Sequence, residues 1–444
     1  MRISLVLLAL LGILGAIVGA CDAAQDQGTL QILFADGGDP FVGPPAAVTL
    51  DVDGIDQDGG VTAIVHGASV SSSNVDLGSL NEQDEYALAV TAYSADGGRV
   101  AFGETLPFEM GAIAAEILPV YVQRTGTLWP MPSPMEDGRN APLLGVLAGE
   151  YIFESGGTDS AYALTNNLYD LVPWAPFTGQ SFTTPPQSLA LSGTVAVGIA
   201  DDGGTAIDFS TNDLSGVTLP TGATWADVAG GQSYVAADGT VFVVGGTRQT
   251  GGPTNVVLVI STSQTASFAF LSTARLGASA AWVNGKGLIV AGGNVSAGGD
   301  AGATGAGVEY LTEGATTGTP VSGYAADPTQ GGGMDAIDAT DVVVVEGSQA
   351  MRFNLNSCGS PCGPTPWATL PESLTFAQVF DIDGQNVFVV GEDATGASHA
   401  VRVSESASTE IPFKIPRNHA RALRLPMGQV AVVGGNATME SFVP

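Results

Sequence analysis

The chain has 444 residues, of which 44 are acidic and 13 basic, so its formal net charge is −31 and its pI is near 4.1. This acid excess argues against a nucleic-acid partner, because binding to phosphates needs a basic surface. The hydrophobic fraction of 45% argues against intrinsic disorder. The 61 glycines, with only 13% charged residues, favour many short strands joined by tight turns.

The first twenty residues form an apolar segment behind a short basic start. Arg2 is followed by a run from Ile3 to Ala20 without a charged residue, and the run ends in Val18-Gly19-Ala20-Cys21. Small residues at the end of such a run are typical of a secretory signal peptide. With the cysteine that follows, they resemble the lipobox of bacterial lipoproteins. The alternatives are ordinary secretion or an uncleaved signal anchor.

The lipobox resemblance implies that residues 1–20 are removed and that Cys21 becomes the lipidated first residue. Residues 21–27 are then a tether. We expect the chain to be attached to a membrane through the lipid on Cys21. We expect the bacterial cell envelope as the location, with the chain anchored to the outer membrane on its periplasmic or surface face. The alternative is the periplasmic side of the inner membrane.

Residues 28–123 contain short runs rich in Val, Ile, Leu, Tyr and Phe, separated by Gly, Asp and Pro. They predict strands at 29–34, 47–52, 61–65, 86–93, 99–102 and 115–122, with a hairpin turn at 94–98. This number of strands suits an antiparallel β-sandwich. The segment looks like the immunoglobulin-like domains of bacterial surface lipoproteins.

This first segment is also the most acidic part of the chain. Between Asp22 and Gln123 there are sixteen acidic residues and one basic residue, Arg99. Residues 51–60 hold four aspartates, which leaves open a calcium site, although the spacing does not fit an EF-hand loop. The alternative is a solvated acidic turn.

A pattern of about 45 residues repeats through the rest of the chain. Each copy has an apolar run, a turn, a second apolar run and then Gly-Gly or a variant of it, as at 156–157, 245–246, 292–293 and 434–435. The seven turns stand at Gly149, Gly193, Gly239, Gly285, Thr340, Gly384 and Gly428, at intervals of 44, 46, 46, 55, 44 and 44. The longest interval contains a Gly/Ala-rich insertion at 296–307. Repeats of this length indicate one array of supersecondary units.

These copies resemble the kelch repeat, whose family fold is a β-propeller with four strands per blade. Three copies also have an arginine eighteen residues before the second glycine, namely Arg139, Arg275 and Arg417. The resemblance covers about residues 125–444 and implies an all-β, seven-bladed, kelch-like β-propeller behind the immunoglobulin-like sandwich.

The two ends of this region predict how the ring closes. The chain stops nine residues after Gly435, which leaves room for about three strands in the last copy. Residues 125–135, with Trp129, look like the end of a kelch repeat. We expect this segment to supply the missing outer strand, so that the two ends of the propeller pair.

The sequence contains no recognisable catalytic constellation. It has three histidines, His66, His399 and His419, and each is expected to be packed or exposed rather than catalytic. The copper site of galactose oxidase, a kelch propeller, has no match here. Cys358 and Cys362 lie in a Gly/Pro-rich loop and are expected to form a disulfide, with free thiols or a metal site as alternatives. We expect no cofactor and no bound metal.

Arg139, Arg275 and Arg417 are the candidate ligand-binding residues. If each begins an inner strand, the three lie at one level of the propeller and are available to an anionic ligand. The alternative is that acidic residues of neighbouring blades neutralise them as structural ion pairs.

The sequence therefore predicts a membrane-anchored extracytoplasmic lipoprotein that is not an enzyme. Its propeller would bind or scaffold an unknown protein or glycan ligand, because loops on a rigid scaffold commonly carry recognition. The alternatives are an extracellular carbohydrate-active enzyme of the galactose-oxidase-like type and a purely structural envelope protein.

Overall fold

The structure, a computed structural model, describes residues 29–33, 38–70, 80, 83–109, 117–236, 238–246, 252–295, 307–321, 332–357 and 365–444. They fall into two compact units. The first unit holds the described residues of Met1–Leu33 and Phe41–Val122. The second unit holds the described residues of Phe34–Pro40 and Gln123–Pro444. Within this part of the chain, no helix is long and apolar enough to cross a membrane.

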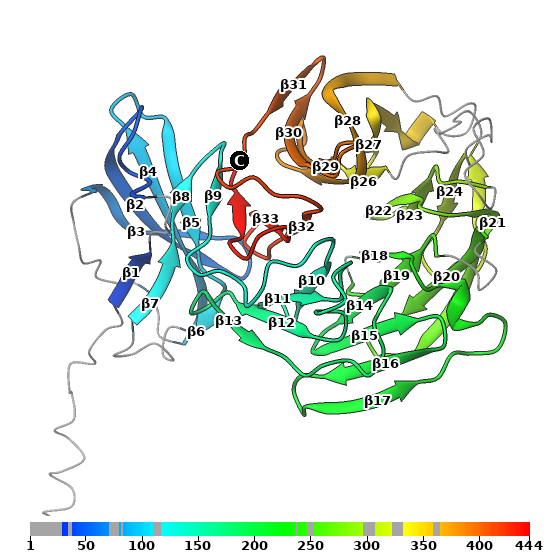
Figure 1. Cartoon of the computed structure of the whole chain (residues 1–444). Coiled ribbons are helices and arrows are strands. Elements are labelled where there is room, and N and C mark those ends of the chain that lie inside the picture. Colours follow the sequence, from blue (N-terminus) through cyan, green and yellow to red (C-terminus); the bar gives the residue numbers. More distant parts are fainter. Residues whose placement is uncertain are drawn as a thin grey trace, which may run out of the picture. The chain divides into compact units, whose positions relative to one another are not determined.

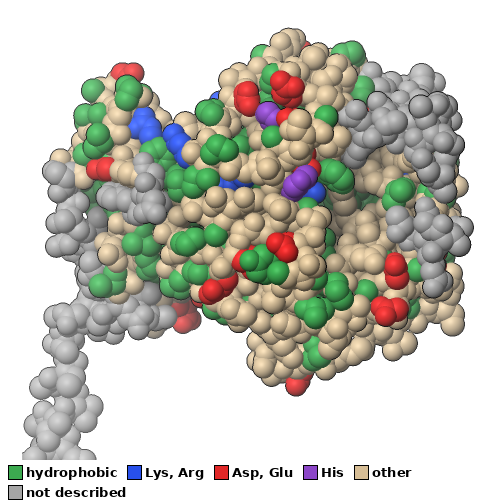
Figure 2. Space-filling model, in the orientation of Figure 1, with side chains coloured by type: hydrophobic (Ala, Val, Ile, Leu, Met, Phe, Trp, Pro, Cys, Tyr) green, Lys and Arg blue, Asp and Glu red, His purple; other side chains and the backbone are tan. Residues whose placement is uncertain are grey.

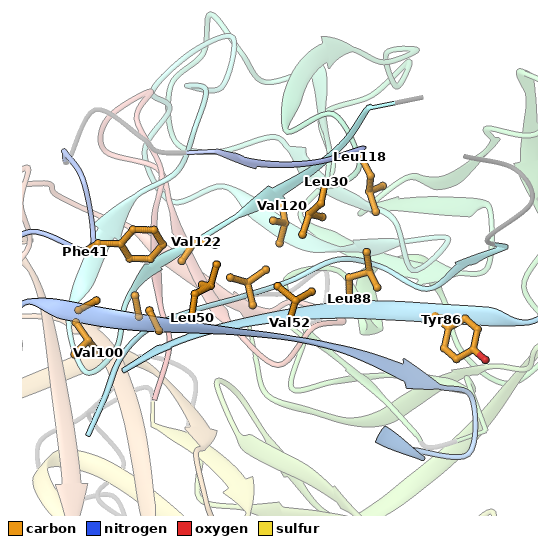
Figure 3. Close-up of a cluster of buried hydrophobic side chains, with 14 of the residues drawn as sticks. Leu30, Phe41, Leu50, Val52, Tyr86, Leu88, Val100, Leu118, Val120 and Val122 are labelled. Atoms are coloured by element: carbon orange, nitrogen blue, oxygen red, sulfur yellow. The ribbon is translucent and has the colours of Figure 1, made fainter. Parts of the chain in front are cut away.

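The first unit consists of two sheets that share one core. The larger sheet has the order β3 (Val61–Ser69), β2 (Ala47–Asp56), β4 (Glu85–Ser94) and β5 (Arg99–Glu104), and β6 (Phe108–Glu109) pairs with β4. The smaller sheet pairs β1 (Thr29–Leu33) with β7 (Ile117–Tyr121). Leu30 and Val120 of the smaller sheet meet Leu50 and Val52 of the larger one (Figure 3).

One pairing in this unit differs from the antiparallel arrangement that the sequence predicts. β1 and β7 run parallel, with Thr29 opposite Ile117 and Leu33 opposite Tyr121. A hairpin joins only antiparallel strands, whereas parallel strands need a long connection. Here strands β2 to β6 lie between β1 and β7 in the sequence. The hairpin expected at 94–98 is present, because the backbone N–H of Ser94 donates to Gly98 O at 2.9 Å and that of Gly97 donates to Ser94 O at 2.9 Å.

The second unit is built from antiparallel sheets that follow one another along the chain, so the predicted all-β class is confirmed. It begins with β8 (Gln123–Arg124) and β9 (Leu128–Pro130). The first two sheets have the orders β10 (Leu143–Leu147), β11 (Tyr151–Ser155), β12 (Asn166–Asp170), β13 (Ala175–Thr178) and β14 (Ser188–Ser192), β15 (Val195–Ala200), β16 (Gly203–Asp208), β17 (Asp213–Val217). The next two are β18 (Gln232–Val235), β19 (Val241–Val244), β20 (Thr254–Ile260), β21 (Ala266–Arg275) and β22 (Ser279–Val283), β23 (Gly287–Ala291), β24 (Val308–Leu311), β25 (Thr319–Val321).

The remaining strands form one six-stranded and one four-stranded sheet. The former has the order β26 (Gly333–Ala336), β27 (Asp341–Asn354), β28 (Thr365–Asp381), β29 (Asn386–Glu392), β30 (Ser398–Ser404), β31 (Ala407–Glu410). The last sheet joins β32 (Arg421–Arg424), β33 (Val430–Val433) and β34 (Glu440–Phe442) to β9. Two 3-10 helices, η2 (Trp225–Asp227) and η3 (Leu355–Ser357), occur in the connections.

The sheets form a closed ring, so the second unit is a β-propeller. Their innermost strands contact one another in the cyclic order β10, β14, β18, β22, β26, β28, β32 and again β10, and these strands lie around a common centre (Figure 1). The last sheet is completed from the other end of the region, since Leu128 pairs with Phe442 and Pro130 with Glu440. This strand lies within residues 125–135.

The core of the propeller lies between neighbouring sheets. Phe153 and Leu168 of one sheet, for example, pack against Leu189 and Ala196 of the next. All four residues of β19 are buried, because both faces of an internal strand are covered by adjacent sheets. This explains why the second strand of each copy is a continuous apolar run.

Candidate functional site

The three arginines predicted from the repeat occupy equivalent, fully buried positions. The side chains of Arg139, Arg275 and Arg417 are all 0% exposed. Each donates to the carbonyl of the first glycine of its doublet, Gly156 at 3.2 Å, Gly292 at 2.9 Å and Gly434 at 3.3 Å. Each also donates to a carbonyl just before the third strand, that of Thr165 at 2.8 Å, Gly307 at 2.8 Å and Thr438 at 2.9 Å. The arginine therefore ties the end of the second strand to the start of the third.

An acidic residue of the same repeat copy neutralises each arginine. The arginines do not begin inner strands as expected: Arg275 ends β21 of the preceding sheet, and Arg139 and Arg417 lie in the segments before β10 and β32. Arg275 pairs with Glu309 of β24, and Arg417 lies 3.4 Å from Glu440 of β34. Arg139 instead pairs with Asp137 at 2.7 Å and lies 3.4 Å from Glu154 of β11. The equivalent third-strand position there is Asn167, which donates to Glu154 at 3.0 Å.

The pKa of the acidic partner differs between the second strand, where Glu154 lies, and the third strand, where Glu309 lies. Burial raises the pKa of Glu154 to about 7, although the Arg139 charge and the Asn167 hydrogen bond lower it in part. Burial also raises the pKa of Glu309, but the backbone N–H of Ser272 and the Arg275 charge outweigh it and hold that pKa below its usual range. On the third strand, the Glu309 carboxylate accepts from the backbone N–H groups of Ser272 and Thr273 in addition to pairing with Arg275.

This burial bears on the two interpretations of the arginines. A guanidinium with no exposed surface, bound to carbonyls and a carboxylate, offers no donor to a ligand from solvent. The arrangement favours the structural role over the ligand-binding role for Arg139, Arg275 and Arg417.

Several predicted positions fall outside the described residues. These are the lipidation site Cys21, the pair Cys358 and Cys362, and residues 296–306 of the insertion. Most of the predicted acidic turn is strand, because β2 continues to Asp56. Asp51 accepts from Gly67 N–H at 2.8 Å and contacts His66 at 2.9 Å. Asp56 accepts from Gly60 N–H at 2.6 Å. Over the described ranges, no group of three or more His, Cys, Asp or Glu side chains is arranged to hold a metal ion.

A cluster that the sequence did not single out lies where the sixth and seventh copies of the repeat meet. Glu392 ends β29 and is buried, with its side chain 4% exposed. One of its carboxylate oxygens is 2.8 Å from Nδ1 of His419, and the other accepts from Nη1 of Arg421 at the start of β32. Glu392 therefore aligns one imidazole and one guanidinium.

The cluster extends through Arg421 to an exposed aromatic ring. The guanidinium carbon of Arg421 lies 5.0 Å from the ring centroid of Phe376, in β28. Phe376 is 52% exposed and the His419 side chain 43% exposed. In the view of Figure 2, histidine surface lies beside arginine and carboxylate atoms over this part of the propeller. We call Phe376, Glu392, His419 and Arg421 the Phe–His cluster.

The backbone of this cluster is strained at two positions. Phe376 has φ of 51° and His419 has φ of 53°, in the left-handed region that bulky side chains avoid. The equivalent residues, sixteen before the second glycine of a copy, are Ala141, Gly230 and Gly277. The chain turns left-handed there as well, with φ of 48°, 80° and 67°. Only Phe376 and His419 put a large ring on this turn among these five positions.

The sequence contained one signal for the cluster. Glu392 replaces the second glycine of its doublet, where a Cβ at the corresponding Gly435 would come within 2.2 Å of Asn418 O. A side chain at this tight position needs a particular reason to be there, and here it supplies the carboxylate.

His399 stands in a separate arrangement on the adjacent strand. Its Nδ1 is 3.0 Å from Glu410 and its Nε2 is 3.3 Å from Asp393. Burial alone would lower the pKa of His399, but these two carboxylates raise it above its usual value. With both ring nitrogens engaged, His399 has no free nitrogen for a ligand.

The comparisons with known proteins identify similar folds only. No protein-family model and no curated protein matches the chain. Similar solved structures include YCF48 from Cyanidioschyzon merolae, at 12% identity and a TM-score of 0.47, covering 72% of this chain and 99% of that one. Another is a quinoprotein alcohol dehydrogenase-like protein from Bacteroides thetaiotaomicron, at 10% identity and 0.43, covering 86% and 93%. A third is the WD40 β-propeller domain of Doa1, at 11% identity and 0.45, covering 69% and 96%. Identities and scores this low carry no argument about function.

Proposed function

We propose that this protein is a lipid-anchored binding protein of the bacterial cell envelope, whose propeller recognises a ligand through the Phe–His cluster. The observation that carries the binding role is Phe376, a half-exposed aromatic side chain held in left-handed backbone. Strain of this kind costs on the order of 1–3 kcal/mol and is concentrated at functional sites. The role is non-catalytic binding.

The propeller in this proposal is kelch-like and seven-bladed. The support is the seven copies in the sequence and the seven innermost strands in cyclic contact. In the six-stranded sheet, β27 and β28 pair over Gly347–Arg352, and β28 then pairs with β29, so two blades share a bent strand. The first unit is an immunoglobulin-like sandwich in the same proposal, supported by its two sheets around one core.

The anchor is supported by the sequence. The apolar run that ends in Val18-Gly19-Ala20-Cys21 has the small residues of a signal-peptide cleavage site and resembles the lipobox, in which the cysteine is lipidated. With several acyl chains, the anchor holds this acidic protein, whose full chain has a net charge of −31, at a membrane without any electrostatic attraction.

Two experiments test this function. Cells that express the full chain are labelled with palmitate; we expect incorporation that Cys21→Ala abolishes and Cys358→Ala preserves. Labelling that survives Cys21→Ala contradicts the anchor.

For the binding role, the detergent-purified full chain is used to capture ligands from envelope extracts. We expect Phe376→Gly to lose a ligand that Phe177→Ala retains, Phe177 being a 41% exposed phenylalanine on β13. Retention by both variants contradicts recognition through the cluster.

A further inference from the structure

We infer that the Phe–His cluster binds a neutral, hydroxyl-bearing ring of the sugar class, an inference that rests on the proposed binding function. The four residues present an apolar ring, an imidazole whose Nε2 makes no hydrogen bond within the described residues, and an arginine, all in one connected set of contacts. Each feature selects a different property of the ligand.

The imidazole selects a hydroxyl group. Glu392 can only accept, so Nδ1 of His419 carries the proton of their 2.8 Å contact. In the neutral ring, Nε2 is then an acceptor, and within the described residues it makes no hydrogen bond to the protein. A carboxylate cannot donate to this nitrogen, whereas a hydroxyl group donates to it and also accepts from it when the ring is charged.

Arg421 supplies complementary donors. Its Nη1 donates to Glu392 and to Ala420 O at 2.9 Å, while Nε and Nη2 have no acceptor within the described part of the chain. Its side chain is 18% exposed. Glu392 already balances the charge of Arg421, so these donors suit the oxygen of a neutral group as well as that of an anion.

Phe376 selects a ligand with an apolar surface. Arg421 covers part of the ring, and 52% of the residue remains open to solvent. Sites for small molecules typically combine apolar surface with a few fixed polar groups. A sugar ring has both, because its C–H bonds contact an aromatic ring while its hydroxyl groups point to the sides.

Charge argues against an anionic ligand. The chain has a net charge of −31, and the carboxylates of Asp393 and Glu410 lie on the adjacent loop and strand. Like charge lowers both the rate and the strength of association with an anion. Neutral ligands do not encounter this barrier.

The test is saturation-transfer NMR on the detergent-purified full chain with glucose, galactose, N-acetylglucosamine and glucuronate as probes. We expect at least one neutral sugar to bind, and glucuronate to bind more weakly than glucose. Phe376→Gly and His419→Asn should each weaken binding about tenfold, which is about 1.4 kcal/mol. Phe177→Ala should leave it unchanged. Asn is used at His419 because it tolerates left-handed backbone, so the variant keeps its fold.

Three results overturn the inference: no neutral sugar binds, binding is insensitive to both substitutions, or glucuronate binds more tightly than glucose. The capture experiment separates this failure from that of the proposed function. A ligand captured in a Phe376-dependent way, without sugar binding, overturns the ligand class alone. Absence of any Phe376-dependent ligand overturns the binding role itself.

Discussion

Phe376 provides a test in which the sign of a stability difference reports the backbone conformation. Replacing Phe376 with Gly removes left-handed strain, which is about 1–2 kcal/mol for a residue with a Cβ. Glycine costs about 0.5–1 kcal/mol in chain entropy. Replacement with Ala loses the same ring contacts but keeps the strain. We therefore expect Phe376→Gly to be more stable than Phe376→Ala by about 0.5–1 kcal/mol.

The absolute loss should be small for a phenylalanine. Complete burial of its side chain is worth about 1.5–3 kcal/mol, and half of this one is exposed. The contact with Arg421 adds about 0.5–1 kcal/mol. After strain relief, Phe376→Gly should cost about 1 kcal/mol, whereas a core phenylalanine costs about 3–5 kcal/mol when truncated.

The assay is urea unfolding of the full chain, followed by intrinsic fluorescence. The control is the same pair of substitutions at Phe177, which is similarly exposed but lies in β13 without a left-handed φ. There the order should reverse, with the Ala variant more stable. If Gly is the less stable replacement at both positions, Phe376 carries no backbone strain, and strain then gives no support to a functional role for this residue.

Three further predictions concern the propeller. Arg275→Ala leaves Glu309 buried without its charge partner and should cost about 3–5 kcal/mol in urea unfolding; a loss below about 1 kcal/mol would contradict the buried pair. The raised pKa of Glu154 means that its stabilising contribution is fully present below the ordinary pKa of 4.5 and is lost as pH rises through about 7. Glu154→Gln should therefore flatten the dependence of the melting temperature on pH across this window, whereas Glu309→Gln should not; equal curves for wild type and Glu154→Gln would refute this. Deletion of residues 125–135 removes β9 and should lower the melting temperature of the whole propeller, and an unchanged temperature would show that the pairing with β34 adds nothing.

The propeller strands could be predicted from the sequence because their signals are local. A turn glycine such as Gly149 or Gly428, with φ of 71° and 83°, is followed by an apolar run that is buried on both sides. Repetition at near-constant spacing then shows that the copies are equivalent. The parallel pairing of β1 with β7 has no such signal, because the two strands are far apart in the sequence.

The arginines and the Phe–His cluster show where pattern alone was insufficient. The repeat located Arg139, Arg275 and Arg417, but burial and acid partners depend on how strands two and three approach each other. The spacing also contained the cluster, since Phe376 and His419 occupy a position that holds Gly or Ala in three other copies. That the position is left-handed becomes evident only from the backbone.

The pairing of β9 with β34 joins the two ends of the propeller, so we expect it to form late in folding. Residues 128–130 have no partner for hydrogen bonding in their sheet until residues 440–442 are available. Gln123 likewise bonds to Ser441, a separation of 318 positions. Contacts this distant in sequence slow folding, because the loop between them must be closed first. Until then β34 has an open edge of the kind that pairs with other chains. Closure of the ring by β9 therefore competes with intermolecular pairing at the edge of β34.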